Sequence, residues 1–162
     1  VFDRLYWERL DSGDICDEEV VNAFKTRLPE RLWDLAEKIY YNWVYNIPEI
    51  DGMSELIDRI KLRYGVKVFL LSNISRYFAS HIDEVPILNK LDGLIMSGPI
   101  GIVKPSREIF EHLCREHKIS PNESIFIDDR VENIEGAIRC GFKGYIFDGD
   151  VDRLRDYLDS IL

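Results

Sequence analysis

Hydrophobic residues recur at helical spacing through the first part of the chain. Val20, Val21, Phe24 and Leu28 fall on one helical face, and acidic residues precede them, where a helix dipole favours negative charge. Pro29 then ends this helix or opens the next one. The same period returns twice more, and we predict helices over three segments: residues 16–28, 30–47 and 52–65.

After Gly65 the pattern changes to short β-branched and aromatic runs that alternate with helical patterns. We predict buried strands in four segments: residues 66–71, 91–97, 125–127 and 144–148. Strands that alternate with helices indicate βαβ units and a parallel sheet with helices on both faces. The sequence therefore predicts an α/β protein, with a helical cap at 1–48 and a Rossmann-like core at 49–162.

Composition narrows the choice of partners. With 46% hydrophobic residues among 162, the chain can form a sizeable core. The formal charge is 21 − 30 = −9, which disfavours nucleic acid and anionic membranes as partners. A phosphorylated small molecule stays compatible with this charge, because the local field at a site matters more than the total.

Cysteine usage and hydropathy suggest where the protein works. Cys16, Cys114 and Cys140 are odd in number and far apart, so we expect neither a disulfide framework nor a zinc site. No apolar run approaches the ~20 residues of a membrane span, and no leader-like segment opens the chain. We therefore expect a cytoplasmic globular protein.

Polar side chains follow three of the predicted strands. Ser72 and Asn73 come directly after the first, Lys104 lies in the loop after the second, and Asp128 and Asp129 follow the third. Ligands of parallel sheets bind beyond the carboxyl ends of the strands, so these groups should converge on one edge. A hydroxyl, an ammonium and two carboxylates suit Mg²⁺ together with a phosphoryl group. A cation would also relieve the repulsion between the adjacent acids.

Each of these features has a purely structural alternative. Ser72 and Asn73 can form a turn after the strand, and Lys104 can be a solvated loop lysine. One of the acids at 128 and 129 can cap the following helix, although a single cap residue suffices. The combination is more specific than any part, because three independent strand ends agree.

Three segments, in this order and spacing, resemble motifs two, three and four of the haloacid dehalogenase-like hydrolases. They read FLLSNIS (69–75), SGPIGIVKPSREIF (97–110) and IFIDDRVENIEGA (125–137). The similarity is greatest to the branch with a small helical cap and paired acids in motif four. That branch includes bacterial sugar-phosphate phosphatases and the phosphatase domain of soluble epoxide hydrolases. The resemblance extends over nearly the whole chain.

The resemblance implies roles for six residues. Ser72 and the backbone N–H of Asn73 would bind the phosphoryl oxygens, and Lys104 would neutralise charge on the phosphoryl group and the attacking carboxylate. Mg²⁺ would be the cofactor. Asp129 would coordinate it directly, and Asp128 would bind it directly or through a water. The sixth, Asn133, is four residues after Asp129 and would orient that acid from the next helical turn.

One motif of the resembled family is missing. Its reaction begins with a D-x-D aspartate at the end of the first strand, which attacks phosphorus to form an aspartyl-phosphate. Phe2-Asp3 lies in a helical pattern with no strand ahead of it, so we do not assign Asp3 as the nucleophile. We expect the nucleophile to lie upstream of these residues. Its strand, central in the family and placed between those ending at Ser72 and Asp128, would then be missing as well.

These observations predict a Mg²⁺-dependent phosphate-monoester hydrolase that acts on a phosphorylated small molecule. A metal-free haloacid dehalogenase is one alternative, and the paired acids argue against it. The other is an inactive binding or regulatory module of the same fold, which the missing motif supports. No pattern in the sequence identifies the substrate or the oligomeric state.

Three packing expectations follow from the same patterns. The aromatic residues between 33 and 45 should pack between the cap and the core, in preference to forming a substrate wall. Gly136 should mark a close approach of two segments. Apolar residues around the acid pair should hold the strand and its helix in the core: Ile125, Ile127, Val131, Ile134 and Ile138.

Overall fold

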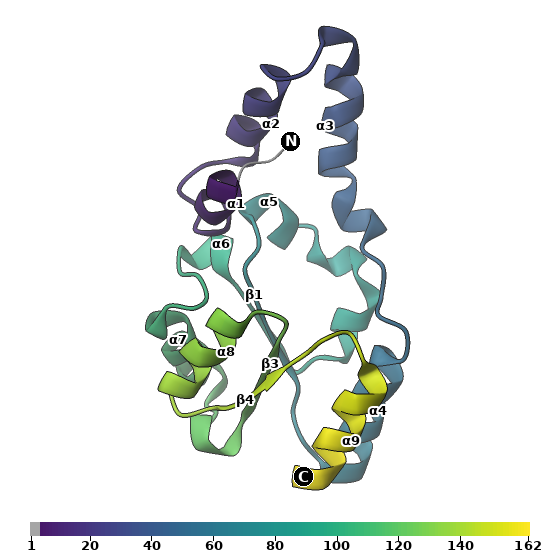
Figure 1. The fold of residues 1–162 in the computed structure, drawn as a ribbon, viewed down its shortest axis with the longest axis vertical. Helices are drawn as coiled ribbons and strands as arrows, with labels where there is room; N and C mark the ends of the chain where they lie inside the picture. The colour runs from purple at the N-terminus through teal and green to yellow at the C-terminus, as the bar shows by residue number, and fades with distance from the viewer. Residues whose placement is uncertain (1–3) are drawn as a thin grey trace. The chain divides into compact units, whose positions relative to one another are not determined.

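The structure is a computed structural model that describes residues 4–162, coloured along the chain in Figure 1. Asp3 lies outside the described residues. The chain forms an α/β fold, which confirms the predicted class. Its contacts divide it into two compact units. The first unit contains the residues up to Pro48, with 72–89 and 96–103; the second contains 49–71, 90–95 and 104–162.

The first unit is helical. Its α-helices are α1 (Arg4–Asp11), α2 (Asp17–Lys25), α3 (Trp33–Tyr41), α5 (Arg76–Ala79) and α6 (Ser97–Ile100). The segment predicted as a single helix over 30–47 instead forms α3 flanked by two 3₁₀ turns, η1 (Glu30–Leu32) and η2 (Trp43–Asn46). The α-helix ends at Tyr41, and the Asn42 carbonyl accepts both the backbone N–H of Tyr45 at 3.2 Å and the side-chain amide of Asn46 at 2.7 Å. The bond from Tyr45 spans three residues, as in a 3₁₀ turn, whereas an α-helix bonds residues four apart.

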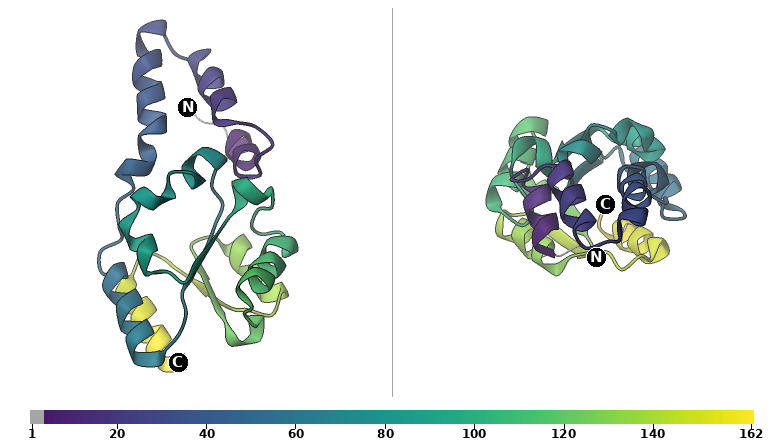
Figure 2. Two further views of the ribbon diagram at one scale, coloured as in Figure 1. Left: turned by 180° about the vertical axis from the view of Figure 1, so that it is seen from behind. Right: turned by 90° about the horizontal axis from the view of Figure 1, so that it is seen from above.

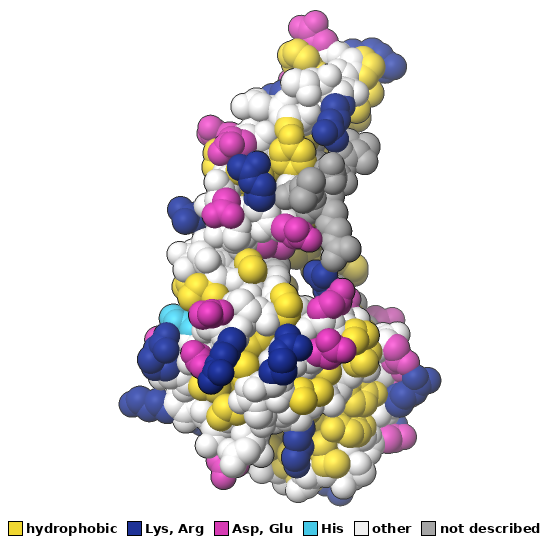
Figure 3. Space-filling model, turned by 60° about the vertical axis from the view of Figure 1, so that its left-hand side comes forward, with side chains coloured by type: hydrophobic (Ala, Val, Ile, Leu, Met, Phe, Trp, Pro, Cys, Tyr) yellow, Lys and Arg dark blue, Asp and Glu magenta, His cyan; other side chains and the backbone are white. Residues whose placement is uncertain are grey.

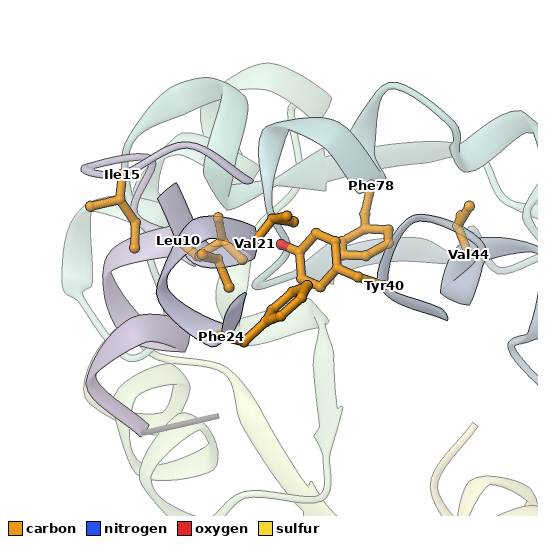
Figure 4. Packing of buried hydrophobic residues seen from close by; sticks show 8 residues of the cluster. Leu10, Ile15, Val21, Phe24, Tyr40, Val44 and Phe78 are labelled. Atoms are coloured by element: carbon orange, nitrogen blue, oxygen red, sulfur yellow. The ribbon is translucent and has the colours of Figure 1, made fainter. Parts of the chain in front are cut away.

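Aromatic rings form the centre of the first unit (Figure 4). The ring of Tyr40 lies between those of Phe24 and Phe78, at centroid distances of 6.2 and 5.6 Å. Phe78 lies beyond the predicted cap but in the same compact unit as Tyr40, so packing between cap and core stays a prediction. Trp43 also contacts Phe78, at a centroid distance of 5.2 Å, although its side chain is about half exposed, as is that of Tyr45.

The second unit contains most of the strands. Its helices are α4 (Met53–Tyr64), α7 (Arg107–His117), α8 (Val131–Arg139) and α9 (Val151–Ile161). Its strands are β1 (Phe69–Ser72), β2 (Gly93–Met96), β3 (Ile125–Asp128) and β4 (Lys143–Ile146). The last residues of β1 and β2 already belong to the first unit. The described strands pair as two ladders, β1 with β2 and β3 with β4. The second ladder is parallel and runs in register from Ile125 opposite Lys143 to Asp128 opposite Ile146.

Helices α4 and α9 lie side by side and cover one face of the second ladder (Figures 1 and 2). Leu56 and Ile60 of α4 pack with Leu154 and Leu158 of α9, and this cluster also contacts Ile125. An ion pair joins the same two helices, because Arg59 donates to both oxygens of Asp159 at 2.9 and 2.7 Å. The hydroxyl of Tyr64 donates to Asp159 at 2.7 Å as well.

This ion pair should make the stability of the protein depend on pH in acid. Hydrogen bonds from Arg59 and Tyr64 lower the pKa of Asp159 to about 2, whereas an unfolded Asp titrates near 4. The stabilisation is therefore complete above about pH 4 and is lost as the pH falls towards 2. Urea unfolding between pH 5 and 2 should show a weaker pH dependence for Asp159→Asn than for the wild type. Asp156→Asn removes the same charge from an exposed position of α9 and is the control. Equal slopes for Asp159→Asn and the wild type would contradict this prediction.

Helix α8 packs closely on the loop that carries Lys104. A Cβ at Gly136 would lie 2.8 Å from the carbonyl oxygen of Pro105 and 3.1 Å from the ring of Phe110. The predicted close approach at Gly136 is therefore confirmed. The glycine allows the helix to rest directly on the loop backbone.

Replacing Gly136 by alanine should lower the free energy of unfolding by about 1–3 kcal/mol, because overpacking outweighs the better helix propensity of alanine. Chemical denaturation would measure this loss. Glu135→Ala changes an exposed neighbour on the same helix and should stay close to the wild type. A Gly136→Ala protein that is more stable than the wild type would show that the loop can move away.

The apolar residues near the acid pair are less buried than the sequence predicts. Ile134 is buried and Ile125 half-buried, but Ile127, Val131 and Ile138 are exposed, so the core prediction is wrong for these three. Helix α8 directs Ile134 and Ala137 inward, which leaves positions 131 and 138 at the edges of its buried face.

Hydrophobic side chains gather at the surface in the lower part of Figure 3. No described helix is long and apolar enough to cross a membrane.

Candidate functional site

The carboxylate of Asp128 is the centre of the candidate site. Asp128 is the last residue of β3 and is buried. The Lys104 ammonium donates to its Oδ2 at 2.7 Å. Its Oδ1 accepts two hydrogen bonds, both 2.9 Å long, from the side-chain amide of Asn133 and the backbone N–H of Arg130. Both carboxylate oxygens are thus engaged by donors of the second unit.

Local sequence explains how these donors reach Asp128. The contact between Asp128 and the Arg130 N–H is a short-range turn of the kind that aspartate forms ahead of a helix. It places α8 so that Asn133, in the first turn, faces back to the strand end. Lys104 comes from the loop that rests on Gly136. Its ammonium also lies 5.7 Å from the centroid of the Phe126 ring.

The Lys104–Asp128 pair is well shielded from water, with side-chain exposures of 10% and 6%. Burial alone would raise the pKa of the Asp128 carboxyl. The Lys104 ammonium, and then the hydrogen bonds from Asn133 and Arg130, outweigh burial and hold this pKa below its usual range. Asp128 is therefore a carboxylate at neutral pH, and it already has three donors.

The side chain of Asp129 lies in a different environment from that of Asp128. Its side chain is exposed, and no hydrogen bond or ion pair joins it to another described residue. Asn133, predicted to orient Asp129, contacts Asp128 instead. The spacing argument from Asp129 to Asn133 assumed a helix between them, but α8 begins only at Val131. In the acid pair, the Asp128 carboxylate is therefore held by three donors, whereas the Asp129 carboxylate is available to a ligand.

A further polar atom beside the pair lacks a donor. Asn133 is buried, and its Oδ1 has no hydrogen-bond partner among the described residues. An unpaired buried acceptor costs about 1–3 kcal/mol, and a bound cation or its waters would remove this cost. The described residues hold no group of three or more His, Cys, Asp or Glu side chains that could bind a metal ion. Two carboxylates and the unpaired amide oxygen of Asn133 are oxygen ligands of the kind that Mg²⁺ prefers, whereas zinc prefers sulfur and nitrogen.

Ser72 and Asn73 belong to the first unit, where Ser72 ends β1. The backbone of Ile74 holds the loop after them: its N–H donates to the Ser97 hydroxyl at 2.9 Å, and its carbonyl accepts from the Gly98 N–H at 3.0 Å. The structure therefore brings Lys104, Asp128 and Asn133 together. The phosphoryl-binding role of Ser72 and Asn73 stays a prediction.

Sequence reasoning missed the backbone N–H of Arg130 as a third donor to Asp128. An aspartate three residues before the first residue of a helix is the signal that could have found it.

The amino-acid sequence matches the haloacid dehalogenase-like hydrolase family over residues 4–141. Over 144 residues it is 26% identical to the D-ribitol-5-phosphate phosphatase of Bacteroides thetaiotaomicron, a match that covers 85% of this chain and 63% of that protein. Over 93 residues it is 31% identical to a sesquiterpene phosphatase of Aspergillus oryzae, covering 57% of this chain and 47% of that protein. The chain thus spans less than two thirds of the length of either relative.

Solved structures agree on the fold. A HAD-family enzyme from Bacteroides thetaiotaomicron, in complex with magnesium and inorganic phosphate, superposes with a TM-score of 0.70. The alignment covers 95% of this chain and 79% of that one, at 21% sequence identity, a level at which the likeness concerns the fold alone. Fold and sequence match lead to one conclusion: the chain belongs to the haloacid dehalogenase-like hydrolase family.

Proposed function

We propose that the protein is a Mg²⁺-dependent phosphatase that hydrolyses phosphate monoesters of small molecules. One observation carries the proposal: an exposed Asp129 lies next to Asp128, which is held by Lys104 and Asn133. An ammonium beside two carboxylates suits a dianionic phosphoryl group bound together with a cation. The names of both curated relatives, which describe phosphatases, support the same class.

Each residue has a distinct part in this proposal. Asp129 would bind Mg²⁺ directly, and Asp128, whose two oxygens already have donors, would bind it through water. The unpaired Oδ1 of Asn133 would accept from that water. When bound, the cation would offset negative charge on the phosphoryl oxygens. Ser72, the Asn73 N–H and Lys104 would hold those oxygens in place, with Lys104 stabilising the charge that develops during transfer.

The proposed nucleophile is an aspartate upstream of these residues. Among the described strands, β1 pairs only with β2, and β3 only with β4. Each ladder thus has an edge strand whose backbone N–H and C=O groups could pair with a further strand. A strand placed between β1 and β3 would use both edges. It would also deliver an aspartate to the edge of the sheet where Asp128 lies.

The remaining parts of the proposal concern domains and location. Residues 1–48 would act as the cap that selects the substrate, and 49–162 as the catalytic core. A cytoplasmic location accords with three free cysteines. The net charge of −9 favours a small-molecule substrate over nucleic acid or an anionic membrane.

Activity assays on the protein expressed from its complete natural reading frame test this proposal. We expect it to hydrolyse p-nitrophenyl phosphate with Mg²⁺, to lose that activity in EDTA and to regain it when Mg²⁺ is restored. Release of halide from 2-haloacids without metal would support the dehalogenase alternative instead. A protein that turns over neither substrate class, despite an intact D-x-D motif, would contradict the proposal and favour a binding module.

A further inference from the structure

A buried carboxylate in the first unit has no part in the proposed chemistry. Asp17, the first residue of α2, is 8% exposed. Its Oδ1 accepts a hydrogen bond from the hydroxyl of Tyr40 at 2.7 Å and another from the hydroxyl of Ser75 at 2.9 Å. Tyr40 belongs to α3, whereas Ser75 lies just after β1, 58 residues further along the chain than Asp17. The carboxylate thus joins two helices of the predicted cap to the segment that follows Ser72.

The hydroxyl of Ser75 donates one hydrogen bond and accepts another. It donates its proton to Asp17 and accepts the backbone N–H of Phe78 at 3.2 Å, which caps the N-terminus of α5. Ser75 is 1% exposed, so water does not compete for either bond. Because both bonds are fixed, the position of Asp17 determines where the end of the loop 72–75 lies.

The opposite side of this loop is also held. The Ile74 N–H donates to Ser97 Oγ, and Arg76 donates through its Nε to the Gly98 carbonyl at 3.0 Å. A Cβ at Gly98 would lie 2.6 Å from the Ile74 carbonyl oxygen, so the two backbones are as close as glycine allows. The loop therefore lies between α6 on one side and Asp17 on the other.

A charged acceptor is an expensive choice for a purely structural contact. Burying a carboxylate costs free energy, and well-packed apolar residues often stabilise a core better. Within the described residues, Asp17 is satisfied by hydroxyl groups and not by a cation. What the charge adds is short, strong and directional hydrogen bonds, which fix the groups that donate to it.

We propose that Asp17 is a positioning residue for phosphate binding. Through Ser75 it sets the loop that presents Ser72 and the backbone N–H of Asn73. Asp17 would then contribute to phosphate affinity without touching the phosphate itself. This inference rests on the proposed function, since it assumes that Ser72 and Asn73 bind phosphoryl oxygens.

Two hydroxyl deletions at the same carboxylate oxygen provide the test. Ser75→Ala removes the bond that leads to the loop, and Tyr40→Phe removes the bond that stays within the cap. Asp17→Ala removes both bonds, and Asp17→Asn keeps an acceptor of the same shape. The measurements, on the protein from the complete reading frame, are the Kd of inorganic phosphate by calorimetry, kcat and KM on p-nitrophenyl phosphate, and the Tm.

We expect Ser75→Ala and Asp17→Ala to weaken phosphate binding by ~10-fold or more and to raise KM, because misplacing a binding group by about 1 Å can cost ~100-fold. Tyr40→Phe should lower the Tm but leave the phosphate Kd within about twofold of the wild type. Asp17→Asn should bind phosphate with an affinity between those of the wild type and Asp17→Ala, because its amide oxygen can accept both hydroxyl groups but lacks the charge that strengthens these bonds.

Equal effects of Ser75→Ala and Tyr40→Phe on the phosphate Kd would overturn the inference, since general destabilisation would then explain both. So would a lower Tm with an unchanged Kd in Ser75→Ala. If Asp17→Ala fails to fold, the comparison of Ser75→Ala with Tyr40→Phe decides alone. A wild type that neither binds phosphate nor hydrolyses its esters would instead refute the proposed function, and this inference with it.

Discussion

Replacing Lys104 by methionine should lower the free energy of unfolding at neutral pH by about 3 kcal/mol, because Asp128 would stay buried without its cation. Methionine keeps the length of the apolar stem, so the change isolates the charge. Lys143→Met removes an equal charge from an exposed position of β4 and should stay within about 0.5 kcal/mol of the wild type. Urea denaturation of both variants measures the difference, and similar stabilities would contradict the prediction.

The sign of the pH dependence gives a second check on the Lys104 variant. In the wild type the pKa of Asp128 lies below its usual range, so the pair stabilises the protein above about pH 4 and ceases to do so at lower pH. Without the ammonium, only the hydrogen bonds from Asn133 and Arg130 oppose burial, so the pKa of Asp128 lies higher than in the wild type and the variant loses less stability as the pH falls. The stability gap between the variant and the wild type should therefore narrow in acid.

A double variant separates folding from function at the same pair. Lys104→Met with Asp128→Asn removes both charges but keeps an amide oxygen that can accept from Asn133 and Arg130, which should recover much of the lost stability. Phosphatase activity should nevertheless stay at least ~100-fold below the wild type, because the electrostatic donor to the phosphoryl group is gone. An active double variant would show that the pair serves the fold alone.

Replacing Asp129 by asparagine should have the opposite profile, with little change in stability and a large loss of activity. The side chain is exposed and has no described partner, so the fold loses nothing when its charge is removed. Turnover of p-nitrophenyl phosphate by the protein from the complete reading frame should fall by at least ~100-fold. Loss of groups that only support metal ligands already costs ~10–100-fold.

Titration of activity with Mg²⁺ distinguishes a ligand from a general charge effect. For Asp129→Asn we expect half-maximal activity at a much higher Mg²⁺ concentration, or no saturation. Glu132→Gln removes one negative charge from the first turn of α8, close in sequence, and should saturate like the wild type. A normal Mg²⁺ titration in Asp129→Asn would exclude Asp129 as the metal ligand.

The order of elements and one half of the site could be predicted from local patterns. Short apolar runs after Gly65 lie on or within a few residues of the four observed strands. The meeting of Lys104 with Asp128 followed from a general rule, since both come after strands of one α/β fold and their separation of 24 residues does not matter.

The errors arose where the local geometry changed. After Tyr41 the chain forms a 3₁₀ turn, in which the Tyr45 N–H bonds to the Asn42 carbonyl, so the helix predicted over 30–47 is interrupted. Helix α8 begins two residues after Asp129, which turns Asn133 to the other acid. The bond between Asp17 and Ser75 spans 58 positions and follows no periodic pattern, so only the three-dimensional structure reveals it.

The parallel pairing of β3 with β4 also has a kinetic consequence. These strands are joined by α8 alone, which packs on both, so their contacts close a short stretch of chain between residues 125 and 146. Forming a contact between residues close in sequence costs the chain little conformational entropy, so such contacts tend to form early in folding. Asp128, Arg130 and Asn133 all lie within this stretch. We therefore expect the frame around the acid pair to form as one early unit, onto which Lys104 docks later.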